Sequence, residues 1–369
     1  MRANERGIAR SILRQAGRQP RIVAAAVTAG FIFGIAYRAA FDPAVERNLA
    51  NYLLSGLHGI GLALAIWVVQ AAFASGAQSL FGAALRRFPL AGEVIVRALV
   101  TTAALIVTGL ALQFALYAES QHLAWLTRHW FTVELPRIVA SAFALSLVIG
   151  VVSEAARLIG APLLTSLVLG TYHRPTRRSL IVMFLDLAKS TGLAETMGEL
   201  RVHDLITRFF FDIDEPIADY GGTVHAYVGD EVIVSWPIGR DATRNARAVA
   251  CFFAIERKMA ALEPEYAAEF GVAPSFRAGI HAGPVIISEC GDAKRQLAFF
   301  GDTMNVAARL CDYCKTINDG LVISGDLMRI MALRTDLVAS PAKRITVRGR
   351  QEPVEALSIR EPQGETTIG

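Results

Sequence analysis

The first 160 residues carry long apolar segments, whereas the rest of the chain alternates short apolar runs with polar turns. Four apolar stretches cover residues 22–41, 53–74, 94–118 and 138–158. About twenty apolar residues suffice for a helix to cross the core of a bilayer. Buried helices of soluble proteins seldom run this long without charges. The pattern therefore predicts four transmembrane helices in the first part of the chain.

After residue 179 the pattern indicates strands and amphipathic helices of ordinary length. It predicts a strand at 180–186, a helix at about 193–219, a hairpin at 223–236, a helix at about 241–262 and a strand at 275–281. A helix at about 303–316 and strands at 320–324 and about 344–347 follow. This order predicts an α+β, ferredoxin-like sheet with helices on one face.

The change in composition divides the chain into five parts. We expect a basic cytoplasmic arm at 1–21, an all-α transmembrane domain of four helices at 22–160 and a short linker at 161–178. A domain of strands and helices at 179–360 and a tail at 361–369 complete the chain. Pro162 should kink or restart a helix in the linker.

Arginines indicate how the four helices cross the membrane. Six precede residue 22, Arg86 and Arg87 lie between the second and third spans, and Arg174, Arg177 and Arg178 follow the fourth. Because cytoplasmic loops are rich in Lys and Arg, both termini and the catalytic part should be cytoplasmic. We expect a multi-pass protein of the inner (plasma) membrane. The net charge of +4 comes mostly from these arginines and does not indicate nucleic-acid binding.

Cysteines and histidines offer few cofactor sites. All four cysteines follow residue 250, in the part expected to be cytoplasmic, so disulfides are not expected. Cys311 and Cys314 have the spacing of a zinc-ligand pair, but no second pair exists, which favours a structural role. His58, His122 and His129 leave haem ligation open as an alternative in the membrane part.

Two aspartates stand where an oxygen-liganded metal site would need them. Asp186 ends the apolar run that starts at Leu180, and Asp230 lies between two runs typical of strands. Carboxylates at strand ends suit magnesium. Asn305 and Arg309 are four residues apart and share one helix face, where an amide and a guanidinium suit ribose and phosphate. The simpler alternatives are a strand-end cap, a hairpin turn residue and a solvated helix arginine.

Residues 179–360 resemble the catalytic domain of class III nucleotidyl cyclases, the adenylate/guanylate cyclase family. The resemblance rests on five segments in family order, FLDLAKST, GGTVHAYVGDEVIVSW, FRAGIHAGPV, FFGDTMNVAARL and ITVRGR. It implies a homodimer in which each active site uses residues of both chains. The implied reaction closes ATP to 3′,5′-cyclic AMP and releases pyrophosphate.

The resemblance also assigns roles to single residues. Asp186 and Asp230 would bind two Mg²⁺ (or Mn²⁺) ions, with the backbone carbonyl of Leu187 as a further ligand. One group of residues would then hold the substrate and its phosphates: Ser190, Thr191, Arg277, Asn305, Arg309 and Arg348. Within that group, Asn305 would orient the ribose, Arg309 would stabilise the α-phosphate, and Arg348 replaces the family's lysine.

The base-reading positions depart from the family pattern. Adenylate-type members usually carry a lysine with Asp or Thr there, and guanylate-type members Glu and Cys, but this chain has Ala226 and Ala298. An apolar pair gives guanine no partner for its polar edge, so ATP is the expected substrate. A guanylate cyclase and a weakly active nucleotide-binding signalling module stay open as alternatives. The sequence does not identify the stimulus sensed by the membrane domain.

Overall fold

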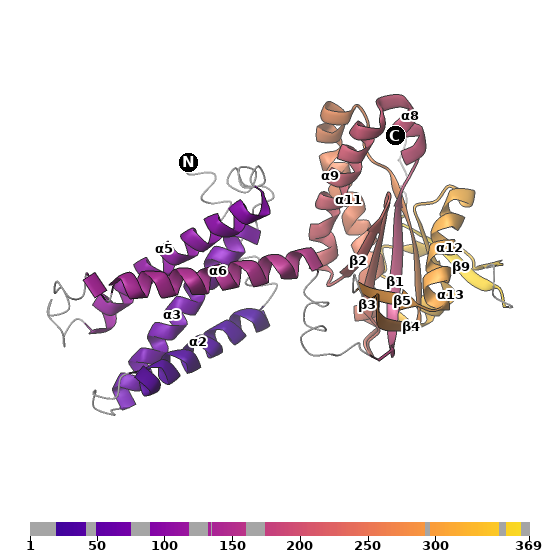
Figure 1. The fold of residues 1–369 in the computed structure, drawn as a ribbon. Helices are drawn as coiled ribbons and strands as arrows, with labels where there is room; N and C mark the ends of the chain where they lie inside the picture. The colour runs from indigo at the N-terminus through magenta and orange to yellow at the C-terminus, as the bar shows by residue number, and fades with distance from the viewer. Residues whose placement is uncertain are drawn as a thin grey trace, which may run out of the picture. The chain divides into compact units, whose positions relative to one another are not determined.

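The computed structural model describes residues 20–41, 49–74, 89–117, 132–133, 135–159, 174–291, 296–346 and 352–362. The chain forms two compact units, Met1–Thr165 and Ser166–Gly369. Figure 1 shows long helices in the first unit and a sheet with helices in the second. The expected arm up to residue 19, Pro162, His122, His129 and Arg348 lie outside the described residues.

Four long helices make up the described part of the first unit. They are α2 (Pro20–Phe41), α3 (Leu49–Ala74), α5 (Leu90–Tyr117) and α6 (Leu135–Ile159). Each contains a segment long and apolar enough to cross a membrane. Large apolar side chains such as Ile32 and Phe33 are 60% and 64% exposed, which suits contact with lipid. The prediction of four apolar helices is therefore confirmed.

Helices α2 and α3 approach each other through glycines. A Cβ atom on Gly30 would overlap the backbone of Gly59, and one on Gly34 would overlap the carbonyl group of Ser55. Small residues let two helix backbones come this close in a membrane, where packing rather than water exclusion drives association. The Nη1 atom of Arg38 adds a hydrogen bond of 3.0 Å to Oγ of Ser55.

Helices α5 and α6 are joined by a buried ion cluster. Arg97 of α5 is 3% exposed, and its Nη2 lies 2.6 Å from Oε1 of Glu93 on the same helix. Its Nη1 lies 3.2 Å from Oε2 of Glu154 on α6. The guanidinium also lies over the ring of Phe73 from α3, 5.1 Å from the ring centre. Charges inside a membrane protein usually pair with one another in this way.

A mixed sheet forms the centre of the second unit. Its strands are β1 (Thr176–Leu187), β2 (Thr223–Val228), β3 (Glu231–Pro237), β4 (Phe276–Cys290), β5 (Gln296–Phe300), β6 (Leu321–Ser324), β7 (Val338–Ala339), β8 (Lys343–Ile345) and β9 (Val354–Arg360). The main order is β2-β3-β1-β4-β6-β9-β7, with β5 paired to β4 and β8 to β9. Strand β1 is antiparallel to both β3 and β4.

Helices cover both faces of this sheet (Figure 1). The helices are α8 (Ser190–Met197), α9 (Glu199–Asp219), α10 (Ala242–Asn245), α11 (Arg247–Phe270), α12 (Asp302–Ile317) and α13 (Gly325–Ile330). Ile181, Met183 and Leu185 of β1 pack in the larger core with α9 and α11. Val182 and Phe184 pack with α12 in a second core, because successive strand residues face opposite ways.

The predicted α+β class is confirmed, with local differences. The expected helix at 193–219 is two helices, separated at Gly198, whose φ of 87° is outside the helical range. The helix expected to end near residue 262 continues through Pro264 to Phe270. The strand expected at 275–281 extends to Cys290. Helix α12 covers the face that the sequence pattern left without a helix.

Candidate active site

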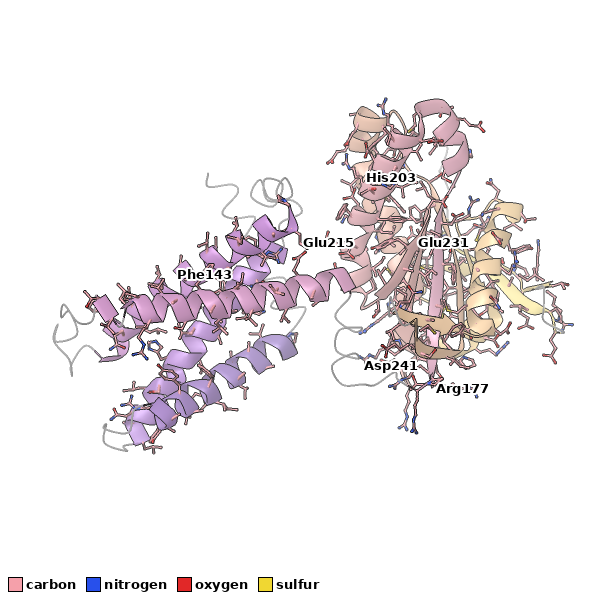
Figure 2. All side chains as sticks on the ribbon, in the orientation of Figure 1. Phe143, Arg177, His203, Glu215, Glu231 and Asp241 are labelled. Atoms are coloured by element: carbon pink, nitrogen blue, oxygen red, sulfur yellow. The ribbon has the colours of Figure 1, made fainter. Side chains whose placement is uncertain are left out.

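Asp186 lies near the end of β1, where the sheet places it between two charged neighbours. Its register partners are Glu231 on β3 and Arg277 on β4. Asp186 is 7% exposed, and Nε of Arg277 donates a hydrogen bond of 3.1 Å to its Oδ2 atom. Arg177 lies near the start of β1, and Figure 2 shows Glu231 toward the opposite end of the sheet from it.

Asp230 occupies the turn between β2 and β3 and is tied to the end of β1. Gly229 precedes it with a φ of 64°, which glycine adopts without steric cost. The backbone N–H of Leu187 donates to the carbonyl oxygen of Asp230 at 3.1 Å. The hydroxyl of Ser190, the first residue of α8, donates to the carboxylate of Asp230. The sheet thus brings Asp186, Leu187, Ser190 and Asp230 to one end of the second unit.

The first turn of α8 follows this end of β1 directly. Lys189 precedes the helix in a left-handed conformation, with a φ of 62° and a ψ of 22°. Such a conformation is uncommon for a residue other than glycine and turns the chain sharply into the helix. Thr191 lies in that first turn, but its side chain is outside the described part of the structure.

Negative charge accumulates around Asp186. Burial first, and then the charges of Asp186, Asp312 and Asp230, raise the pKa of Glu231 to about 7, against the opposing effect of Lys315. Like charges held close together disfavour ionisation, so the neighbouring carboxylates add to the effect of burial. A cation bound among them would relieve that field.

The donor set fits a hard divalent cation. Two carboxylates and a backbone carbonyl offer only oxygen ligands, which magnesium prefers. Among the described residues no group of three or more His, Cys, Asp or Glu side chains could hold a metal alone. Magnesium sites commonly take one or two carboxylates and complete the shell with substrate phosphates and water.

Asn305 and Arg309 lie on α12, in its first half. Both residues are exposed, and Nη1 of Arg309 pairs with Oδ2 of Asp312 at 3.2 Å. Within the described part of the chain, neither residue forms a hydrogen bond or ion pair with Asp186 or Asp230. The predicted residues therefore form two groups on one chain, each open to a further molecule.

The two positions that the sequence predicts to read the base, Ala226 and Ala298, lie on β2 and β5, and one aromatic contact joins these strands. The rings of His225 and Phe299, neighbours of Ala226 and Ala298, have centres 4.0 Å apart. Nε2 of His225 forms a hydrogen bond of 2.7 Å with Oγ of Ser235. Burial lowers the pKa of His225 to about 4, so its imidazole is neutral near pH 7. The β2–β3 register shifts between Val224 and Ala226, which makes His225 a bulge residue.

A family model decides the identity of the second unit. The model for the adenylate and guanylate cyclase catalytic domain matches residues 173–358. The chain belongs to this family. The cyclase domain is thus the unit that holds the sheet and both groups of candidate residues.

Named relatives agree with that assignment. Adenylate cyclase 2 of Rhizobium meliloti is 33% identical over 219 residues, 57% of this chain and 60% of that protein. Adenylate cyclase 1 of the same organism is 28% identical over 50% of this chain and 28% of its own length. A bacterial light-regulated adenylyl cyclase of known structure shares the fold, with a TM-score of 0.51, 20% identity and coverage of 63% of this chain and 67% of its own. The match therefore covers less than two thirds of either Rhizobium cyclase.

The sequence analysis did not predict three charged residues that lie near Asp186 in the structure, Glu231, Asp312 and Lys315. Glu231 directly follows Asp230, but its position opposite Asp186 comes from the long-range pairing of β1 with β3, which the hairpin alone does not predict. Asp312 and Lys315 follow Arg309 at steps of three, which places all three on one side of α12. What the sequence lacks is the placement of that helix against β1, which brings Lys315 to Asp186.

Proposed function

We propose that this protein is a membrane-bound adenylate cyclase that converts ATP to 3′,5′-cyclic AMP and pyrophosphate at sites shared by two copies of the chain. The observation that carries the proposal is the meeting of Asp186, Asp230 and Arg277 at one end of the sheet. Membership of the cyclase family and the adenylate cyclase relatives support it.

The reaction requires charge neutralisation and alignment more than covalent chemistry. The ribose 3′-oxygen bonds to the α-phosphorus, the bond from that phosphorus to the bridging oxygen of the β-phosphate breaks, and the hydroxyl proton is released. Two divalent ions, when bound, lower the pKa of the hydroxyl and neutralise the triphosphate. Asp186, Asp230 and the carbonyl of Leu187 would hold them.

The chain's cationic and polar groups would act on the phosphates. Arg277 is held beside Asp186 and is suited to a terminal phosphate. The amides at the start of α8, with Ser190 and Thr191, offer donors to the same group, because a helix N-terminus favours anions. Arg348 would add a further guanidinium.

The second half of each site would come from the partner chain. Asn305 would position the ribose, and Arg309 would stabilise charge that develops on the α-phosphate. Their exposure supports this assignment, because a partner can reach them only on an open surface. A homodimer would then hold two equivalent sites.

ATP is the proposed substrate, with the catalytic domain on the cytoplasmic side of the inner membrane. Ala226 and Ala298 provide no polar partner for guanine, whose unpaired edge would cost binding energy. Arginines flanking the four apolar helices support the orientation. Both termini would then be cytoplasmic.

The decisive experiment is a cyclic-nucleotide assay on purified full-length protein. ATP and GTP are each supplied with magnesium or manganese, and products are separated by chromatography. Cyclic AMP from ATP is expected, with activity lost in Asp186→Asn and Asp230→Asn variants that stay folded and membrane-bound. Cyclic GTP as the main product would make the protein a guanylate cyclase. Tight nucleotide binding without turnover would instead indicate a signalling module.

A further inference from the structure

Lys315 of α12 brings a second cation to Asp186. Its Nζ atom lies 3.3 Å from Oδ2 of Asp186 and 3.3 Å from Oδ1 of Asp312. The same Oδ2 atom accepts the hydrogen bond from Nε of Arg277. Two side-chain cations therefore share one carboxylate oxygen of Asp186. The proposed binding of a metal by Asp186 does not require Lys315.

The two cations differ in how firmly they are held. Arg277 is the register partner of Asp186 in the sheet, and its side chain is 19% exposed. The side chain of Lys315 is 48% exposed and reaches Asp186 from a helix. Lysine has a flexible stem and a compact ammonium group, so it can leave one carboxylate with little rearrangement. Lys315 is therefore the cation that can move.

The charge of Lys315 is secure near neutral pH. Lysine is ordinarily protonated at that pH, and the carboxylates of Asp186 and Asp312 both lie 3.3 Å from its Nζ atom. The charged ammonium group beside Asp186 fills space next to the carboxylate and weakens its attraction for a divalent ion. Lys315 and the divalent ion would therefore compete for the carboxylate of Asp186.

We propose that Lys315 is a positioning residue, a tethered counter-cation that holds Asp186 in the metal-free chain and must leave it before a divalent ion binds. The inference rests on the proposed function, because it takes Asp186 as a metal ligand. It predicts that Lys315 weakens metal affinity while it keeps the carboxylate of Asp186 in place. The competing interpretation is a surface ion pair with Asp312 that has no effect on the metal.

The test measures Mn²⁺ binding to full-length protein without nucleotide, by electron paramagnetic resonance of free Mn²⁺. The site of interest is the one lost in Asp186→Asn. Lys315→Met, which keeps the apolar stem, should raise Mn²⁺ affinity roughly two- to five-fold, the range of a half-exposed ion pair. Lys315→Arg should retain an affinity close to that of the wild type.

A charge-matched control separates direct competition from a general field effect. Arg309→Met removes a cation that also pairs with Asp312 but does not contact Asp186. The proposal predicts a smaller rise in this variant than in Lys315→Met. An equal rise in both variants, or no rise in Lys315→Met, would overturn it. If Asp186→Asn itself left Mn²⁺ binding unchanged, the metal site of the proposed function would fail, and the role of Lys315 with it.

Discussion

Arg97 of α5 and Glu154 of α6 form an ion pair inside the first unit, with Nη1 and Oε2 3.2 Å apart. The Nε atom of Arg97 is buried and has no hydrogen-bond partner among the described residues. The arginine therefore depends on its two glutamates, Glu93 and Glu154, to offset the cost of burying its charge.

We predict that Glu154→Ala destabilises the helical unit by roughly 1–3 kcal/mol, because buried Arg97 loses one of its two carboxylate partners and keeps Glu93. The double variant Arg97→Leu/Glu154→Leu should restore most of the loss, since the one charge that it leaves, Glu93, lies in the first turn of α5, where a carboxylate is favoured. Thermal unfolding of the protein in detergent micelles measures both variants. A double variant as unstable as Glu154→Ala would show that packing, not charge, dominates at this position.

The glycine contact between α2 and α3 leads to a second prediction. Gly34→Ala should lower the thermal unfolding midpoint in micelles, because its Cβ would overlap the carbonyl group of Ser55 and push the helices apart. Gly109→Ala is the matched control, since its nearest neighbour would be 3.9 Å away. Alanine favours a helix by about 1 kcal/mol over glycine, so the control should be neutral or slightly more stable.

Complementation tests the shared site. Asp186→Asn and Arg309→Ala are each expected to be inactive as homodimers. Co-expressed, they should regain part of the activity, because one of the two sites in a mixed dimer has an intact residue at both positions. Differently tagged chains allow mixed dimers to be purified and assayed for cyclic AMP. Purified mixed dimers without activity would contradict the division of residues between chains.

Base selectivity should be modest. A site without polar readers discriminates by shape, which gives ratios of roughly 10–200-fold rather than about ten-thousand-fold. We expect ATP to be preferred over GTP within that lower range, measured as the ratio of kcat/KM values. Ala226→Lys with Ala298→Asp should sharpen the preference. A wild-type enzyme that already rejects GTP about ten-thousand-fold would mean that other residues read the base.

His225 should make stability fall in mild acid. Its pKa is about 4 in the folded protein and near 6.5 when unfolded. Below about pH 6.5 the unfolded chain gains a proton that the folded chain does not, so the stabilisation present above that pH is lost as the pH falls toward 4. His225→Gln should flatten this dependence. The urea midpoints of the wild type and of His225→Gln are measured at about pH 7.5 and about pH 5. An equal fall of the midpoint between these pH values in both proteins would contradict the assignment.

The sequence revealed features that depend on local pattern. The four apolar helices follow from their length alone, and Asp186 and Asp230 follow from apolar runs that end in polar turns. The longer course of β4 was missed because Gly283 and Pro284 interrupt its pattern. The structure pairs Pro284 with Ser179 and continues the strand, so long-range pairing outweighs the local signal. The contact between Lys315 and Asp186 likewise depends on how α12 packs.

That packing is unusually close at Gly279. A Cβ atom there would overlap the backbone of Ala307 and Cys311, so α12 rests directly on β4. On this one helix, Lys315 touches the chain's own Asp186, while Asn305 and Arg309 are proposed to serve the partner's site. A shift of the helix would then move residues at both sites of a dimer. Substrate bound at one site would change affinity at the other, and such coupling is reciprocal. Saturation curves with a Hill coefficient different from one would be its signature.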